Sequence, residues 1–111
     1  MSPSGRHERV ALNESRFRDI NDKLRKDMAQ LRMPPDRIRF VCECGNFDCR
    51  DHVDMELSDY ERVRAGSRDF FVVPGHEIED AEDVVDRHDD FNVVRKHDDV
   101  ADLVEKTDPR R

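Results

Sequence analysis

Residues 38–57 read IRFVCECGNFDCRDHVDMEL, and this stretch organises the rest of the chain. Apolar and polar residues alternate on both sides of a short cysteine-rich segment, first at Ile38 and Phe40 and then at Val53, Met55 and Leu57. Alternation with a period of two is typical of strands that bury one face. The segment between them is short and rich in turn-forming residues. We therefore expect an antiparallel hairpin over residues 37–57 with the cysteines at its turn.

The three cysteines form a C-x-C-x4-C motif that favours a metal site. Residues two apart in an extended chain point to the same side, so the thiols of Cys42 and Cys44 face one point. Gly45 lets the chain turn back, and Cys49 returns at the start of the second strand. An odd number of cysteines makes a poor disulfide framework. Since zinc takes thiolate and imidazole ligands in a tetrahedron, the motif predicts one bound Zn²⁺ per chain.

The fourth ligand is sought among the histidines. His52 follows Cys49 closely, but in a continuing strand its side chain points away from that of Cys49. His76 comes directly after Pro74-Gly75 at the end of the apolar run Phe70-Phe71-Val72-Val73, where it would tie the hairpin to the rest of the fold. We favour His76, and leave His52, an acidic side chain or water as alternatives. The remaining histidines sit among charged residues and are expected on the surface: His7, His88 and His97.

The other patterns predict an α+β fold, with an N-terminal amphipathic helix followed by a small antiparallel sheet that carries a zinc-knuckle hairpin, and one or two short helices. Asn13 is a suitable N-cap, and an apolar stripe follows it at helical spacing (Phe17, Ile20, Leu24, Met28 and Leu31). Ser58 and Glu61 form a capping box for a second helix. The predicted elements are a flexible arm over 1–12, a single zinc-stabilised domain over 13–106 with helices 13–33 and 59–65 and strands 69–73 and 91–95, and a tail over 107–111.

Composition supports the need for a metal. The chain has 111 residues, of which 42% are charged and 35% hydrophobic, so it offers one small domain with a thin core. Zinc binding would add folding free energy that such a core lacks. No apolar run is long enough for a membrane span and no secretory signal is recognised, so we expect a cytoplasmic protein without membrane contact.

Charge is unevenly distributed along the chain, whose formal net charge is −7. Residues 1–41 contain ten Lys and Arg against six Asp and Glu, whereas residues 76–111 contain six against thirteen. An acidic chain is a poor general ligand for nucleic acid. The pattern favours a protein partner of unknown identity, with nucleic acid a less favoured alternative and a homodimer through the N-terminal helix a further one.

A longer pattern joins these motifs. It consists of Phe40-Val41-Cys42-Glu43-Cys44-Gly45, Cys49, Leu57-Ser58-x-Tyr60-Glu61 and Phe71-Val72-Val73-Pro74-Gly75-His76-Glu77. This pattern resembles small uncharacterised bacterial zinc-ribbon-like hypothetical proteins. The resemblance implies a Cys3His zinc site at Cys42, Cys44, Cys49 and His76, and it implies no established activity.

Function is expected to follow from a closed metal site. The chain has no H-E-x-x-H motif, no zinc-deaminase pattern, no nucleophile elbow and no phosphate-binding loop, so no catalytic residue is assigned. The preferred hypothesis is a non-enzymatic protein in which structural zinc stabilises a scaffold for protein–protein interaction, including a regulatory one. The alternatives are a nucleic-acid-binding zinc-ribbon regulator, or a redox or metal sensor that uses the zinc thiolates.

Overall fold

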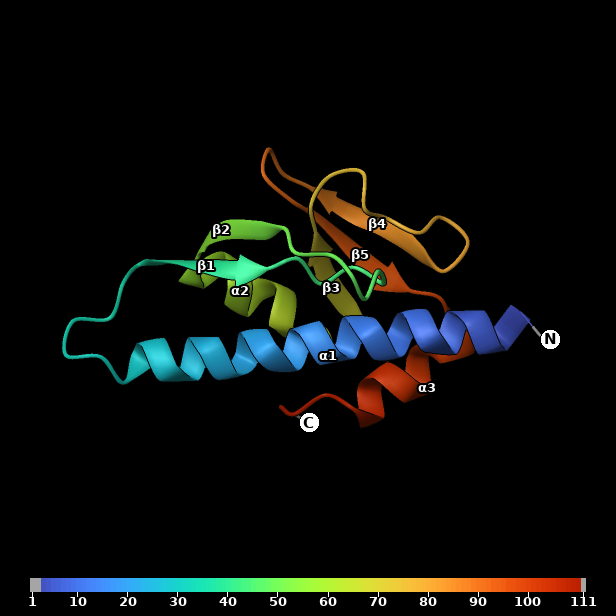
Figure 1. The fold of residues 1–111 in the computed structure, drawn as a ribbon, viewed down its shortest axis with the longest axis horizontal. Coiled ribbons are helices and arrows are strands. Elements are labelled where there is room, and N and C mark those ends of the chain that lie inside the picture. Colours follow the sequence, from blue (N-terminus) through green and yellow to red (C-terminus); the bar gives the residue numbers. More distant parts are fainter. Residues whose placement is uncertain (1–2, 111) are drawn as a thin grey trace.

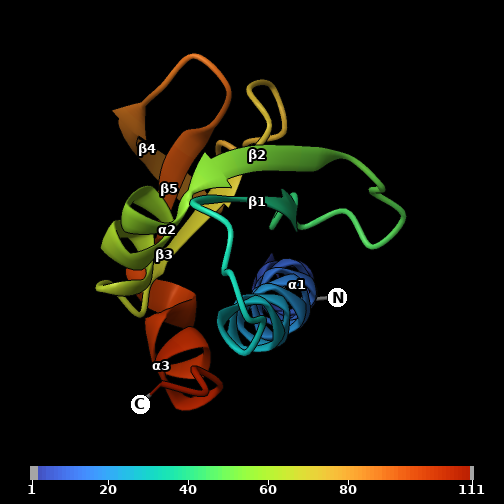
Figure 2. The same ribbon diagram turned by 90° about the vertical axis from the view of Figure 1, so that its left-hand side faces the viewer.

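The long helix α1 (Pro3–Ala29) extends along the molecule, with the strands on one side of it and α3 (Asp98–Lys106) packed against it (Figure 1). The computed structural model describes residues 3–110. A helix of 27 residues is about 40 Å long, most of the 50 Å length of the molecule. Helix α1 is therefore the element against which the other parts are placed, as the view along it also shows (Figure 2).

Two antiparallel sheets face this helix. Strands β1 (Arg37–Val41) and β2 (His52–Glu56) form the predicted hairpin, in which buried Ile38 pairs with Met55 and buried Phe40 with Val53. The second sheet has the order β3-β5-β4, made of β3 (Asp69–Val72), β4 (Glu82–Arg87) and β5 (Asn92–Lys96). The α+β class is confirmed, with two small sheets in place of the single one expected.

An aromatic cluster joins the hairpin to the second sheet. The rings of Phe40 on β1 and Tyr60 on α2 (Leu57–Arg64) stack with centroids 4.2 Å apart. Phe71 on β3 meets both of them edge-on, each with a centroid distance of 6.0 Å. Aromatic pairs in these geometries add to the free energy of burial, so these three rings strengthen the packing where the sheets meet.

The start of α1 corrects the prediction of a flexible arm over 1–12 and of a helix over 13–33. The helix begins at Pro3, a residue suited to a first turn, and Val10 and Ala11 within it are buried. Asn13 is inside the helix and donates a side-chain hydrogen bond to the carbonyl of Gly45, so it is not an N-cap. Residues 1 and 2 lie outside the described part. The helix ends at Ala29, four residues earlier than predicted, ahead of Pro34-Pro35.

The buried face of α1 also differs from the predicted apolar stripe. Ile20 and Leu31 are about half exposed, while Arg18 and Asn21 are fully buried. The guanidinium of Arg18 donates to the carbonyls of Ser67 and Val104, each at 2.7 Å, and its carbon lies 4.7 Å from the Phe70 ring centroid. Buried polar groups are tolerated when they are hydrogen-bonded, and these partners belong to distant parts of the chain.

The predicted second helix and tail are corrected as well. Helix α2 begins at Leu57 with Glu56 as its N-cap and no side-chain cap hydrogen bond, so Ser58 lies inside the helix and does not cap it. Glu61 is instead paired with Arg25 and Arg110. The predicted tail is packed over residues 107–110, where the buried carboxylate of Asp108 contacts Arg64. Residue 111 is not described. The strands predicted over 69–73 and 91–95 are found one residue shorter and one residue later, respectively.

Within residues 3–110, none of the helices combines the length and the apolar character that crossing a bilayer requires.

We expect Asp108→Ala to lower the free energy of unfolding by about 3 kcal/mol, because it leaves the fully buried guanidinium of Arg64 with Asp22 as its remaining carboxylate partner. Burial alone would raise the pKa of Asp108, but the hydrogen bond from Arg64 lowers this pKa to about 2. Urea denaturation followed by circular dichroism measures the change. The control is Asp102→Ala on the exposed face of α3, and equal stability of the two variants would show that the buried pair contributes nothing.

Candidate metal centre

The four predicted metal ligands meet beside the end of β3. We call residues 42–51, between β1 and β2, the knuckle. Cys42 and Cys44 follow β1, Cys49 precedes β2, and His76 stands in the turn after β3. Their ligand atoms all lie within 4.8 Å of one another, and no other such group of three or more potential ligands occurs in residues 3–110. The structure thus places together the residues that the sequence selected.

The spacing of the ligand atoms fits a tetrahedral zinc ion. The Nδ1 atom of His76 lies 3.5 Å from the Sγ of Cys42 and 3.7 Å from the Sγ of Cys49. Zinc–sulfur and zinc–nitrogen bonds of about 2.3 and 2.0 Å, at tetrahedral angles, separate sulfur and nitrogen by about 3.5 Å. These two separations therefore match a tetrahedral zinc site, and all four donor atoms lie close enough together to share one ion.

The thiols interact closely enough to perturb each other's protonation. A hydrogen bond between the thiols of Cys42 and Cys44, together with burial, raises the pKa of Cys42 well above its ordinary value. The same hydrogen bond lowers the pKa of Cys44 to about 5. Burial raises the pKa of Cys49. Three neighbouring thiolates repel one another, so the donor set is suited to a divalent cation that stabilises all of them in the ionised form.

The turn after β3 orients the imidazole of His76. Gly75 has a φ of 98°, a left-handed conformation that favours glycine, and the His76 amide donates to the Val73 carbonyl at 2.9 Å. With Nδ1 directed at the sulfurs, Nε2 lies 3.4 Å from the carboxylate of Asp51. A carboxylate on the second ring nitrogen fixes the tautomer and orientation of a metal-binding histidine, and Asp51 was not recognised from the sequence.

The remaining histidines lie away from this centre. His52 is exposed on β2 and does not belong to the ligand group, so the local alternative is not the arrangement found. His88 and His97 are partly exposed and pair with Asp86 and Asp83, respectively. His7 departs from the expectation of a surface residue, since its side chain is mostly covered between Asp80 and Asp99.

Helix α1 forms side-chain hydrogen bonds with the knuckle and with the adjoining end of β1. The side-chain amide of Asn21 pairs with the backbone of Val41, accepting from its N–H and donating to its carbonyl, both at 2.9 Å. The side-chain amide of Asn13 donates to the carbonyl of Gly45 at 3.0 Å. Gly45 was predicted to serve a turn, but its φ is not positive, and what requires glycine is the close approach of Val10 and Ile78.

Glu43 is a further residue of the site whose role the sequence reasoning missed. It is fully buried between two ligands, and its N–H donates to the carbonyl of Phe71 on β3 at 3.0 Å. Its carboxylate accepts a hydrogen bond from Asn21 at 2.9 Å, and burial raises its pKa to about 8. The sequence does contain a signal for this burial. In an extended chain residue 43 faces the opposite way from Cys42 and Cys44, and here that direction is toward the protein interior.

Backbone donors complete the surroundings of the sulfurs. The N–H of Val73, the residue after β3, donates to the Sγ of Cys42 at 3.3 Å, so the segment that follows β3 supplies both a hydrogen bond and a ligand. Cys42 and Cys44 are buried, whereas Cys49 remains partly exposed.

No protein-family model, curated protein or solved structure matches this chain, so the interpretation of the site depends on its own geometry.

We expect Gly45→Ala to destabilise the protein by about 1–3 kcal/mol, because the added Cβ would lie 2.5 Å from Val10 Cγ1 and 2.8 Å from Ile78 Cδ1. Gly5→Ala is the matched control, since a Cβ there meets nothing within 4 Å and alanine favours the helix by up to about 1 kcal/mol. Thermal unfolding measures both changes. If Gly45→Ala were as stable as Gly5→Ala, the close packing of α1 on the knuckle would be refuted.

Proposed function

We propose that this protein binds one zinc ion through Cys42, Cys44, Cys49 and His76, and that the ion is structural. The observation that carries the proposal is the convergence of three sulfurs and one imidazole nitrogen within 4.8 Å. Cys3His is a common ligand set of structural zinc sites, which are tetrahedral and closed by protein ligands. Softer thiolate ligands also argue against magnesium or calcium, which prefer oxygen.

The position of the ligands supports a structural role. Three of them belong to the hairpin and the fourth follows β3, so a bound ion would cross-link the two sheets. Structural zinc contributes about 10 kcal/mol or more to folding, which is as large as the whole stability of many small domains. Cys42 and Cys44 are 1% and 2% exposed, so the ion would be held away from solvent on that side.

The resulting stable fold is best explained as a non-enzymatic scaffold for a protein partner. A net charge of −7 disfavours a polyanion, while α1 carries a small excess of basic residues, with seven Lys and Arg against five Asp and Glu. Charge asymmetry of this kind promotes selective association between proteins.

The purified protein should contain about one zinc per chain by elemental analysis, and removing it with a chelator should lower the melting temperature. His76→Ala should reduce zinc affinity by more than the roughly 10–100-fold typical of losing a residue that only orients a ligand. His52→Ala, the matched control, should leave affinity unchanged because His52 lies outside the ligand group.

A protein that is fully folded and free of metal would refute the structural role. If His52→Ala lost zinc and His76→Ala retained it, the fourth ligand would have to be reassigned.

A further inference from the structure

A groove about 400 Å³ in volume lies between α1 and the knuckle. Its walls come from the middle of α1, the end of β1 and the knuckle, and its lining is mainly apolar. We call it the knuckle groove, and it is lined by Arg16, Phe17, Ile20, Val41, Phe47, Cys49, Arg50 and His52. It adjoins the candidate metal centre through Cys49, which is the most exposed of the three cysteines.

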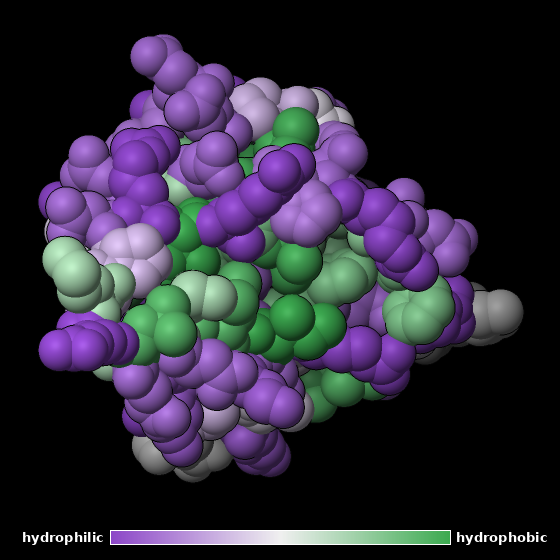
Figure 3. All heavy atoms as spheres, turned by 60° about the vertical axis from the view of Figure 1, so that its left-hand side comes forward, coloured by the Kyte–Doolittle hydropathy of each residue, from purple (hydrophilic) through white to green (hydrophobic). Residues whose placement is uncertain are grey.

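Two large hydrophobic side chains of the groove are open to solvent. Phe47 at the knuckle and Ile20 on α1 are 51% and 46% exposed. Five of the six large hydrophobic residues exposed within the described chain lie on α1, on the turn after it or on the knuckle. The space-filling view with the end of α1 brought forward shows apolar side chains gathered in a patch bordered by hydrophilic ones (Figure 3). Patches of this kind mark interaction sites.

The groove carries positive charge in an acidic protein. Arg16 lies over the Phe47 ring, 5.2 Å from its centroid, and Arg50 donates to the carbonyls of Phe47 and Cys49. Across residues 3–110, neither arginine forms an ion pair with a carboxylate. No Asp or Glu lines the groove, although the chain has 27 of them among its 111 residues. The charge of both guanidinium groups is therefore available to a ligand.

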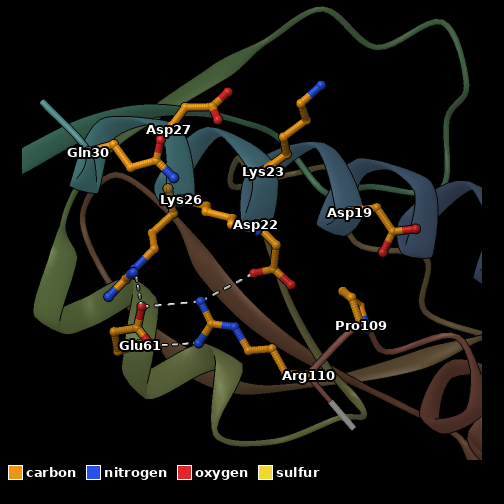
Figure 4. A pocket seen from close by; sticks show the side chains of 10 residues that line it. Asp19, Asp22, Lys23, Lys26, Asp27, Gln30, Glu61, Pro109 and Arg110 are labelled. Atoms are coloured by element: carbon orange, nitrogen blue, oxygen red, sulfur yellow. Dashed lines mark hydrogen bonds and ion pairs between the residues drawn. The ribbon is translucent and has the colours of Figure 1, made fainter.

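A larger pocket, about 890 Å³ between α1, α2 and the C-terminal segment, is different (Figure 4). Glu61 is paired there with Arg25 and Arg110, and Arg110 also lies 3.4 Å from Asp22. Its lining residues carry equal numbers of positive and negative charges. Because the lining charges sum to zero, this pocket has no comparable preference for a ligand of one sign.

We propose that the knuckle groove binds a peptide segment of a partner protein in which apolar side chains are flanked by Asp and Glu. The apolar residues contact Phe47 and Ile20, and the acidic ones pair with Arg16 and Arg50. This inference rests on the proposed function, because zinc at Cys49 fixes the knuckle and so the wall that contains Phe47. An acidic peptide is favoured over nucleic acid because the groove is mainly apolar and the whole protein is acidic.

The experiment is selection of a random peptide display library on the zinc-loaded full chain, followed by fluorescence polarisation with the enriched peptides. Enriched sequences should combine Phe, Leu or Ile with Asp or Glu. Binding should weaken roughly tenfold or more in Phe47→Ser and in Arg16→Glu, since each removes a central contact of the groove. The matched controls are Val85→Ser, an exposed apolar residue on β4, and Lys26→Glu, an exposed cation on α1 outside the groove; both should bind as the wild type does.

Zinc content and circular dichroism, measured on every variant, separate this inference from the proposed function. A folded chain without zinc refutes the proposed function, whereas a zinc-loaded, folded chain that enriches no acidic apolar peptide refutes only the groove proposal. Equal loss of binding in the groove variants and in their controls also overturns it. The groove proposal is likewise overturned if a single-stranded oligonucleotide binds more tightly than the peptides and Arg16→Glu abolishes that binding. It is also overturned if the wild type is a dimer that Phe47→Ser converts to a monomer.

Discussion

The contact between the knuckle and the end of β3 is the constraint on which the rest of the structure depends. The two sheets share no strand, and a two-stranded hairpin such as β1–β2 is at best marginally stable by itself. At this contact the N–H of Glu43 bonds to Phe71, the N–H of Val73 approaches Cys42, and His76 joins the cysteines. A bound ion would convert these weak contacts into a cross-link between segments about thirty residues apart. The aromatic cluster and α1 can then pack across both sheets.

The interior explains why a protein with 42% charged residues has a definite fold. Several charged side chains are buried beside groups of opposite charge: Lys96 lies 2.7 Å from Glu14 and 3.1 Å from Glu82, and Arg64 joins Asp22 to Asp108. Burial with Glu82 nearby raises the pKa of Glu14 well above its ordinary value. Buried ion pairs contribute little net stability because their desolvation is costly, although removing one partner is destabilising. They align α1, β4, β5 and the C-terminal segment, while hydrophobic packing and the proposed metal provide the stability.

The parts predictable from the sequence are those set by local periodicity. Alternation gave the hairpin and its buried residues, and the spacing of Cys42, Cys44 and Cys49 with the Pro74-Gly75 corner indicated the ligand group. The face of α1 was not predictable in the same way. Arg18 is buried because its partners include the carbonyl of Val104, 86 residues away, and polar residues with such partners interrupt the expected apolar stripe. The packed C-terminal segment was missed for the same reason, since the partner of Asp108 is Arg64 on α2.

The feature we propose at the centre of this structure is one zinc ion held by three sulfurs and one imidazole nitrogen. X-ray absorption at the zinc edge of the purified protein tests it most directly, because the fine structure reports the number, type and distance of the ligands. We expect three sulfur atoms at about 2.3 Å and one nitrogen at about 2.0 Å. A shell dominated by oxygen or nitrogen, or one that lacks the imidazole contribution, would contradict it.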